Sequence, residues 1–579
     1  MVNSMNQYIF YIVILVLLAI PLGLYIGKVM NGEKVLLSKI LVPCEKLVYR
    51  FLKIDSSEEM NWKKYGACIL WISGISFTVL FLILLLQGIL PFNPQGIKGM
   101  GIPLAFNTAV SFVTNTNWQA YSGEAQASYF TQTVGFTVQN FISAAVGISV
   151  LFVVIRGFIN KQKEQLGNFW VDFTRIILYV LIPLSIILSV LLVSQGVVQN
   201  PGSYETVNLV QPITLDNGQT VTQEIVPMGL AASQIAIKQL GTNGGGFFGA
   251  NSAFPLENPT ILSNILEMLS ILLIPAALCF TFGRNIKNKK QGIAIFSAMM
   301  IVLLTALTIT AISEHTGTPQ VTSNTSVDSS TVNQSGGNME GKESRFGIAS
   351  SVTWSVFTTA ASNGSVNSML DSYTPMGGIS LMLLIQLGEV IFGGVGCGLY
   401  GMIGFAILTV FIAGLMVGRT PEFLGKKIEP FEMKMAVFAC LATPVAILVG
   451  SGIATLVPSI TNSLTNSGAH GFSEILYAYS SAGGNNGSAF AGLAADTPFL
   501  NISLGVVMLF ARFVPLLAML AIAGSLAKKK KIAVTSGTLS TTNTMFVFLL
   551  IFVILLIGAL SFFPVLALGP IAEHLKMIM

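Results

Sequence analysis

Long apolar runs recur along the whole chain, and polar stretches separate them. A helix that crosses a membrane needs roughly 20 predominantly apolar residues. The runs that reach this length lie at about 7–27, 66–90, 131–156, 174–196, 260–282, 291–313, 378–417, 434–455, 499–525 and 544–567. The pattern therefore predicts an all-α polytopic membrane protein with about ten transmembrane helices.

The seventh run differs from the others because it is too long for one simple crossing. Glycines interrupt it between Gly388 and Met402. Non-helical backbone at membrane depth is tolerated only where it is buried in protein or faces a water-filled cavity. We therefore predict a helix that is broken inside the protein, beside a water-filled path.

A second pattern occurs four times, in connections between the long runs. Each time, a short apolar stretch that is too brief to span is followed by a cluster of Asn, Gly, Ser and Thr. The clusters align in register on Thr116, Asn243, Asn363 and Asn486, which are separated by 127, 120 and 123 residues. This near-constant period predicts a repeated unit of helix, short helix, polar loop and helix.

Four such units account for eight of the ten predicted helices and leave one extra helix at each end. The predicted units are 1–30 (extra helix), 66–156 (repeat 1), 174–282 (repeat 2), 291–417 (repeat 3), 434–525 (repeat 4) and 544–567 (extra helix). One Asn/Gly cluster alone is equally well explained as a turn between helices. Four clusters in register favour channel-like repeats whose loops meet around one pore.

Composition agrees with a bilayer as the main solvent. Of the 579 residues, 53% are apolar and 9% are charged, whereas roughly 25% are charged in soluble domains. We therefore expect contact with a lipid bilayer and no nucleic-acid partner. The five cysteines have no CxxC spacing, which argues against both a disulfide framework and a zinc site.

Basic residues gather in alternate connections. The segments 28–64, 156–175, 284–290, 419–434 and 528–531 hold 24 of the 30 Lys and Arg residues, and the connections 197–230 and 456–498 hold none. Lys and Arg in short loops stay preferentially on the cytoplasmic side. We therefore expect both termini and the four Asn/Gly clusters on the extracytoplasmic side.

The composition of the clusters suits a filter of backbone carbonyl oxygens. Gly and Asn tolerate the left-handed backbone that such loops require, and carbonyl oxygens can replace the water shell of a cation. The four cores contain no Asp or Glu, so K⁺ fits better than Ca²⁺ or Mg²⁺, which usually need acidic ligands. The predicted K⁺ filter residues are Asn115, Thr116, Asn117, Thr242, Asn243, Gly244, Gly245, Ser362, Asn363, Gly364, Asn485, Asn486 and Gly487.

Several long motifs resemble one known family. The stretches TNTNWQAYSGE (114–124), TNGGGFFGANSAFPLENPT (242–260) and SAGGNNGSAFAGL (481–493) look like the potassium-binding A subunit of the Kdp-type potassium-transporting ATPases. The stretch FGGVGCGLYGM (392–402) resembles that family's interrupted third-repeat helix, and the resemblance covers essentially the whole chain. No loop reads TVGYG, and Asn117 stands where the other repeats have Gly. We therefore expect a less symmetric filter than that of a potassium channel.

The resemblance implies a non-catalytic subunit of an ATP-driven potassium import complex in the bacterial plasma membrane. A P-type ATPase B subunit would bind ATP, with a C subunit and, as a further candidate, a small single-helix F subunit. No cofactor and no transition metal are expected, and K⁺ is the transported ligand. In agreement, the chain has no DKTGT phosphorylation motif. The alternative is a stand-alone potassium channel or ion-coupled symporter of the same superfamily, and a membrane enzyme would need a site that no motif indicates.

Two charges within the apolar runs are candidates for the ion path, since intramembrane charges are costly and functional by default. Glu389 lies at the start of the glycine-rich break, where it would attract a cation, and Gly393, Gly394 and Gly396 follow it. The resemblance implies that Arg512 is a fixed positive charge that limits leakage. The alternatives are a paired carboxylate at a helix end for Glu389 and snorkelling to the interface for Arg512.

Four other polar residues are predicted to have no direct role in ion binding. Lys238 closes the second short apolar stretch, where a cation complements the C-terminus of a helix. His315, His470 and His574 lie outside the predicted filters, and we expect each to be solvated in a loop.

Overall fold

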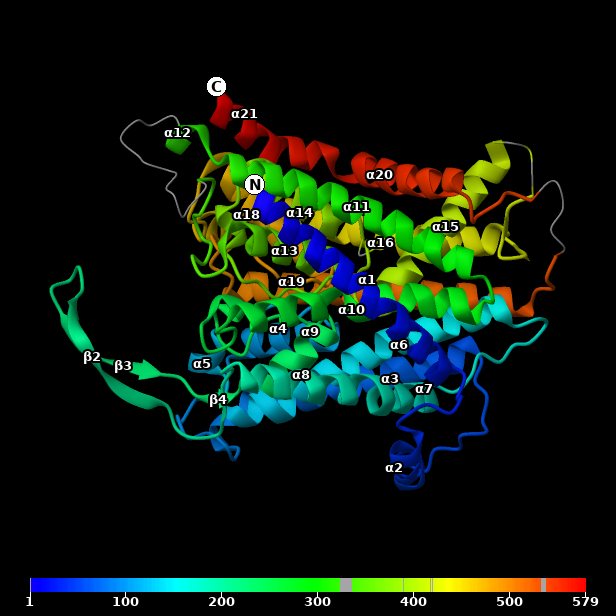
Figure 1. The fold of residues 1–579 in the computed structure, drawn as a ribbon, viewed down its shortest axis with the longest axis horizontal. Coiled ribbons are helices and arrows are strands. Elements are labelled where there is room, and N and C mark those ends of the chain that lie inside the picture. The colour runs from blue at the N-terminus through cyan, green and yellow to red at the C-terminus, as the bar shows by residue number, and fades with distance from the viewer. Residues whose placement is uncertain (1, 323–335, 389, 417, 419, 533–537) are drawn as a thin grey trace.

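The computed structural model describes residues 2–322, 336–388, 390–416, 418, 420–532 and 538–579. Within these residues, ten helices are long and apolar enough to cross a membrane. They form one bundle, and both termini lie at the same end of it as the hairpin of β2 (Glu205–Thr214) and β3 (Thr220–Val226), at the left in Figure 1. The predicted all-α membrane architecture is confirmed.

The spanning segments follow the predicted apolar runs closely. They are α1 (Val2–Met30), α3 (Trp62–Leu86), η2 (Thr131–Thr137) with α6 (Val138–Ile159), α7 (Phe169–Arg175) with η3 (Ile176–Leu181) and α8 (Ile182–Ser194), α10 (Ile261–Asn285), α11 (Lys289–Thr316), α15 (Cys397–Met416), α16 (Pro430–Ala454), α19 (Pro498–Lys528), and α20 (Thr544–Leu566) with η6 (Ala567–Ile571) and α21 (Ala572–Ile578). The seventh predicted run is divided into α14 (Pro375–Gln386) and α15, with non-helical backbone between them. The predicted break is therefore confirmed.

Four short helices precede the Asn/Gly clusters. They are α4 (Ile102–Val113), α9 (Ala231–Leu240), α13 (Gly347–Ala360) and α18 (Gly468–Gly483). Most of their residues are buried, although each helix is too short to span a membrane. Glycine caps the C-terminus of two of them, at Gly241 and Gly484, which turns the chain into the loop that follows.

The spanning helices differ in the share of their residues that is buried inside the bundle. The buried share is 83% for the α6 span, 78% for α10, 67% for α15 and 61% for α19, against 28% for α3, 39% for α7–α8, 56% for α11 and 44% for α16. In each predicted repeat, therefore, the second spanning helix is more buried than the first. This places the second helices around the centre of the molecule, beside the short helices and their loops.

The remaining elements belong neither to the spanning helices nor to the four short helices, and the sequence pattern does not predict them. The amphipathic helix α2 (Ser38–Phe51) follows the first span, and the hairpin β2–β3 pairs Glu205 with Val226. The other elements are η1 (Gln87–Ile89), α5 (Gly123–Gln126), β1 (Gln199–Asn200), β4 (Gly229–Leu230), η4 (Asn251–Ala253), α12 (Pro319–Thr322), η5 (Leu370–Ser372), β5 (Glu422–Phe423), β6 (Lys426–Lys427) and α17 (Pro458–Thr461).

Candidate ion-binding site

The loop after α4 contacts the loops after α9 and α18. Asn115 donates from Nδ2 to the carbonyl oxygen of Thr242 at 2.8 Å, which joins the first loop to the second. Asn485 donates from Nδ2 to Oγ1 of Thr116 at 3.0 Å, which joins the fourth loop to the first. These two contacts link segments that are separated by 127 and 369 residues along the chain.

Two further contacts close the ring. Asn363, in the third loop, donates from Nδ2 to the carbonyl oxygen of Lys238 at the end of α9, at 3.1 Å. Ser362 donates from Oγ to the carbonyl oxygen of Asn485 at 2.9 Å, which joins the third loop to the fourth. Each loop therefore contacts the next, in the order one, two, three, four and back to one.

Three glycines allow this close approach. Gly244, Gly364 and Gly487 have φ values of +78°, +90° and +97°. Residues that carry a side chain rarely adopt this region of backbone conformation. A Cβ atom at any of them would also overlap with a backbone carbonyl oxygen of the next loop, which belongs to Asn363, Asn486 and Thr116, respectively. Glycine is therefore required at these three positions for two independent reasons.

The first loop has asparagine rather than glycine at the junction with the next loop. Asn117 occupies the corresponding position with φ +53°. Its Nδ2 donates to the carbonyl oxygen of Gly244 at 3.2 Å and to Oδ1 of Asn140 on α6 at 2.9 Å. The ring is thus asymmetric, with a side-chain amide at one junction and glycine at the other three. Every predicted filter residue is buried except Gly487, which is half-buried.

Lys238 makes contacts beyond those expected of a cation at the end of a helix. Its side chain is buried beside the second loop, where Nζ donates to the carbonyl oxygen of Gly245 at 2.8 Å and forms an ion pair with Glu257. Oε2 of Glu257 accepts from the backbone N–H of Phe247 at 3.0 Å. Lys238 lies in the last turn of α9, as predicted, and its charged group also binds the second loop and Glu257.

The glycine-rich break between α14 and α15 lies against two of the loops. The backbone N–H of Gly393 donates to the carbonyl oxygen of Ala360 at 2.9 Å, at the end of α13. The backbone N–H of Val395 donates to Oγ1 of Thr242 at 2.9 Å. These two backbone N–H groups of the break therefore have hydrogen-bond partners in and next to the ring. Buried backbone polar groups require such partners.

The other residues of the break are equally buried. Gly394 and Gly396 have no exposed surface of note, and Gly396 adopts φ +87°. A Cβ atom at Gly396 would overlap with the carbonyl oxygen of Gly147 on α6, which explains the need for glycine there. Glu389 lies outside the described residues, so its predicted role stays a prediction.

Arg512 lies buried on α19, with 5% of its surface exposed. Its Nη1 donates to Sγ of Cys397, the first residue of α15, at 2.7 Å. A cavity of about 40 Å³, lined by Arg512, Gly388, Cys397 and the predicted filter residue Asn485 among others, is large enough to hold water. Snorkelling to the membrane interface is therefore the wrong interpretation, and a positive charge borders the same cavity as the loop after α18.

In the part of the chain that the structure describes, ten helices long enough to span a membrane, four short helices and a closed ring of loops define an all-α polytopic membrane protein. The model of the potassium-transporting ATPase A subunit family matches residues 9–575. The chain belongs to this family.

Named relatives cover the whole chain. A protein named "potassium-transporting ATPase potassium-binding subunit" from Clostridium botulinum (strain Eklund 17B / Type B) is 70% identical over 578 residues, which is 100% of both chains. A protein of the same name from Clostridium perfringens is 68% identical over 100% of both chains. The crystal structure of the potassium transporter TrkH from Vibrio parahaemolyticus is similar with a TM-score of 0.51 over 86% of this chain and 96% of that chain. At 13% identity, this similarity concerns the fold alone.

Proposed function

We propose that this chain is the potassium-binding subunit of an ATP-driven potassium import complex. The observation that carries the proposal is the closed ring of four loops, whose cores contain no Asp or Glu. Neutral oxygens held at fixed spacing compensate the dehydration of a large monovalent cation. The names of the relatives, which cover the whole length of the chain, support the same function.

The binding step follows from the way the ring is built. K⁺ would enter from the extracytoplasmic side, lose water and bind carbonyl oxygens of residues 115–117, 242–245, 362–364 and 485–487. Hydrogen bonds between neighbouring loops keep the oxygens apart when the ion leaves, so the site does not need to reorganise. This preorganisation favours an ion of one size, which is the basis of selectivity over Na⁺.

The onward path would run past the glycine-rich break and the cavity beside Arg512. A guanidinium group bordering this cavity raises the free energy of a cation there, which would oppose free leakage. Glu389, with the opposite charge, would favour the cation on its way to the pump. Gly393, Gly394 and Gly396 would let the break change its backbone conformation as the path opens.

The chain itself would be non-catalytic and would need no cofactor. ATP would be bound by a P-type ATPase B subunit, and the C and F subunits would complete the complex. We place the complex in a bacterial plasma membrane, with both termini and the β2–β3 hairpin on the extracytoplasmic side. The concentration of Lys and Arg in the alternate connections supports this orientation.

The test is equilibrium binding of K⁺ and Na⁺ to the purified complex by isothermal titration calorimetry. We expect saturable K⁺ binding, much weaker Na⁺ binding, and at least about tenfold weaker K⁺ binding (about 1.4 kcal/mol) in Gly487→Ala. Gly96→Ala is the matched control, because Gly96 also has a positive φ (+64°) but open space around it. Equal affinity for both ions, or an unaffected Gly487→Ala variant, would overturn the proposal.

A further inference from the structure

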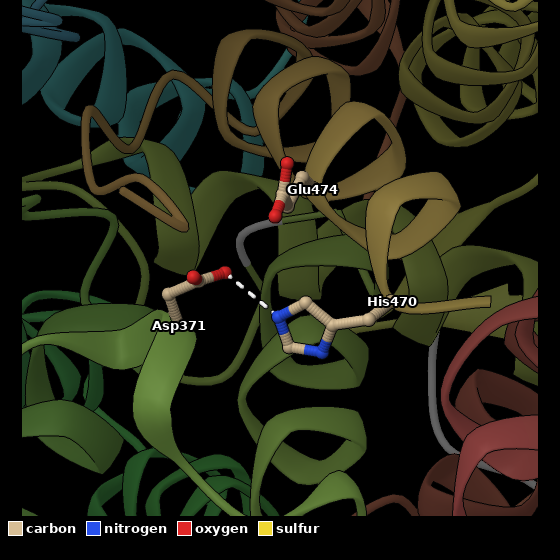
Figure 2. A group of neighbouring side chains, drawn as sticks. All are labelled: Asp371, His470 and Glu474. Atoms are coloured by element: carbon tan, nitrogen blue, oxygen red, sulfur yellow. Dashed lines mark hydrogen bonds and ion pairs between the residues drawn. The ribbon is translucent and has the colours of Figure 1, made fainter. Parts of the chain in front are cut away.

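A cluster of ionisable side chains lies away from the ring, where η5, α18 and α21 meet. Asp371 comes from η5, which follows the third loop, and His470 and Glu474 lie one turn apart on α18. Figure 2 shows the three side chains converging from these two elements. One potential ligand atom from each lies within 4.8 Å of the others.

Within this cluster, Glu474 is the residue whose environment indicates a bound ligand. Its side chain is fully buried, with 0% of its surface exposed. Oε1 accepts from Nδ2 of Asn466 at 2.8 Å, but Oε2 has no hydrogen-bond partner in the part of the chain that the structure describes. One carboxylate oxygen is directed toward Asp371 and His470 in Figure 2. A buried carboxylate oxygen without a partner is costly, and a bound cation would remove that cost.

His470 is held in the orientation that a metal ligand needs. Its Nε2 lies 3.1 Å from Oδ1 of Asp371, and its Nδ1 lies 2.8 Å from Oε1 of Glu573 on α21. The imidazole ring also stacks on Phe490, with ring planes 15° apart. In metal sites, a carboxylate on the far nitrogen of histidine commonly fixes the tautomer and the ring orientation. Glu573 is placed to do this.

We propose that Asp371, His470 and Glu474 bind a divalent transition-metal ion, with Zn²⁺ as the best match, and that Glu573 orients His470. One imidazole nitrogen and two carboxylate oxygens are ligands that Zn²⁺ accepts. Ligands of a tetrahedral Zn²⁺ lie about 3.3 Å apart, given bonds of about 2.0 Å. The 3.1 Å between Asp371 and His470 is close to this value, and Glu474, with an oxygen within 4.8 Å of both ligand atoms, would move toward them to complete the set.

Such an ion would connect three parts of the extracytoplasmic face. Asp371 belongs to the segment after the third filter loop, His470 and Glu474 belong to the short helix of the fourth repeat, and Glu573 belongs to the C-terminal helix. The side chains of His470 and Glu573 are 20% and 26% exposed, so an ion can enter from solvent. The excess of carboxylates over imidazole also favours a dication.

The competing explanation is an ion-pair cluster with a proton in place of the metal. Hydrogen bonds with Asp371 and Glu573 raise the pKa of His470 to about 10, so a metal-free cluster holds a protonated imidazole at neutral pH. This explanation leaves Oε2 of Glu474 without a partner. The two explanations differ in whether the protein binds one Zn²⁺ at this place.

The test is Zn²⁺ titration of the EDTA-treated, purified complex by calorimetry. We expect one Zn²⁺ per chain, with affinity at least about tenfold lower in His470→Gln and Glu474→Gln and about 10–100-fold lower in Glu573→Ala. His315→Gln is the matched control, since His315 contacts Tyr8 rather than this cluster, and it should bind Zn²⁺ as the unmodified complex does.

K⁺ binding by each variant serves as the check that it has folded. Anomalous diffraction at the zinc absorption edge, from crystals of the unmodified complex, gives a second measurement that needs no variant. We expect one peak between Asp371, His470 and Glu474. Absence of Zn²⁺ binding, equal affinity in His470→Gln, or a peak elsewhere would overturn the metal site and leave the ion-pair cluster.

Discussion

The ring contains two kinds of junction between neighbouring loops. At three of them, Gly244, Gly364 and Gly487 approach the next loop so closely that a Cβ atom would overlap with a carbonyl oxygen. At the fourth, Asn117 reaches the next loop with a side-chain amide, which donates to the carbonyl oxygen of Gly244 at 3.2 Å. The backbone is left-handed at all four positions, but the residue at that position approaches the next loop with main-chain atoms in three junctions and with its side chain in one.

The four positions are therefore not equivalent, although they belong to one repeat. At a glycine junction, the backbones of the two loops lie so close together that there is no room for a Cβ atom. The asparagine junction is set by a hydrogen bond, which can lengthen at modest cost. Consistent with this, a Cβ atom at the neighbouring Gly245 would lie 3.1 Å from the carbonyl oxygen of Asn117, a tight contact that is still less severe than at the glycine junctions. The following variants, in order of decreasing effect, test this comparison.

Lys238→Met should have the largest effect, because it leaves the charge of Glu257 buried without its partner. Losing one member of a buried ion pair costs about 3–5 kcal/mol, and Gly245, beside the asparagine junction, would lose the donor to its carbonyl oxygen. We expect a strongly lowered unfolding temperature, measured by thermal unfolding in detergent. The double variant Lys238→Met/Glu257→Gln should recover most of the loss. Equal instability of both variants would show that the ion pair is not the cause.

Gly244→Ala should damage the ring next most. The added Cβ atom would collide with Asn363, and alanine is strained at φ +78°. We expect K⁺ affinity to fall by at least about 100-fold (about 2.8 kcal/mol) in equilibrium binding. Gly96→Ala separates backbone strain from collision, since its φ is +64° in open space. If both variants bind K⁺ alike, the close approach of the loops is not essential.

Asn117→Gly would convert the fourth junction into the type of the other three. It removes the hydrogen bonds to Gly244 and Asn140 and adds backbone freedom. We expect K⁺ affinity to fall about tenfold (about 1.4 kcal/mol), with less selectivity against Na⁺. Asn140→Ala, which removes only the outer hydrogen bond, should have a smaller effect. Unchanged or improved selectivity in Asn117→Gly would mean that the amide does not define the junction.

Ser362→Ala should have the smallest effect of the four. It removes one hydroxyl donor between the third and fourth loops, to the carbonyl oxygen of Asn485, and leaves the backbone contact of Gly364 in place. A hydrogen bond of this kind contributes about 1 kcal/mol, so we expect K⁺ affinity to fall about fivefold. Ser194→Ala is the control, because that hydroxyl donates only within its own helix, to Leu191.

Much of this architecture could be predicted from the order of residues. Apolar runs predicted the spanning helices because length and hydropathy suffice for that purpose. The glycines between Gly388 and Met402 predicted the break because few other residues fit irregular buried backbone. The register of the Asn/Gly clusters indicated four loops of one kind. Their meeting in a ring depends on tertiary contacts, which the repeat suggests and the structure describes.

The sequence does not predict side-chain partners that lie elsewhere in the chain. The position of Lys238 at the end of a helix follows from the local pattern, but its partner Glu257 lies 19 residues later, beyond the reach of any local pattern. His470 was expected to be solvated, whereas its partners Asp371 and Glu573 are 99 and 103 residues away. Periodicity reports which face of a helix is buried, but it does not report which charges meet there.

The most direct test of a potassium-binding ring is anomalous diffraction from crystals of the complex in which Rb⁺ replaces K⁺. We expect a rubidium peak that is enclosed by the loops of residues 115–117, 242–245, 362–364 and 485–487 and lies within bonding distance of backbone carbonyl oxygens from all four. The peak should disappear when Na⁺ is the only cation. A crystal with Rb⁺ ordered elsewhere, and none inside the ring, would contradict the account.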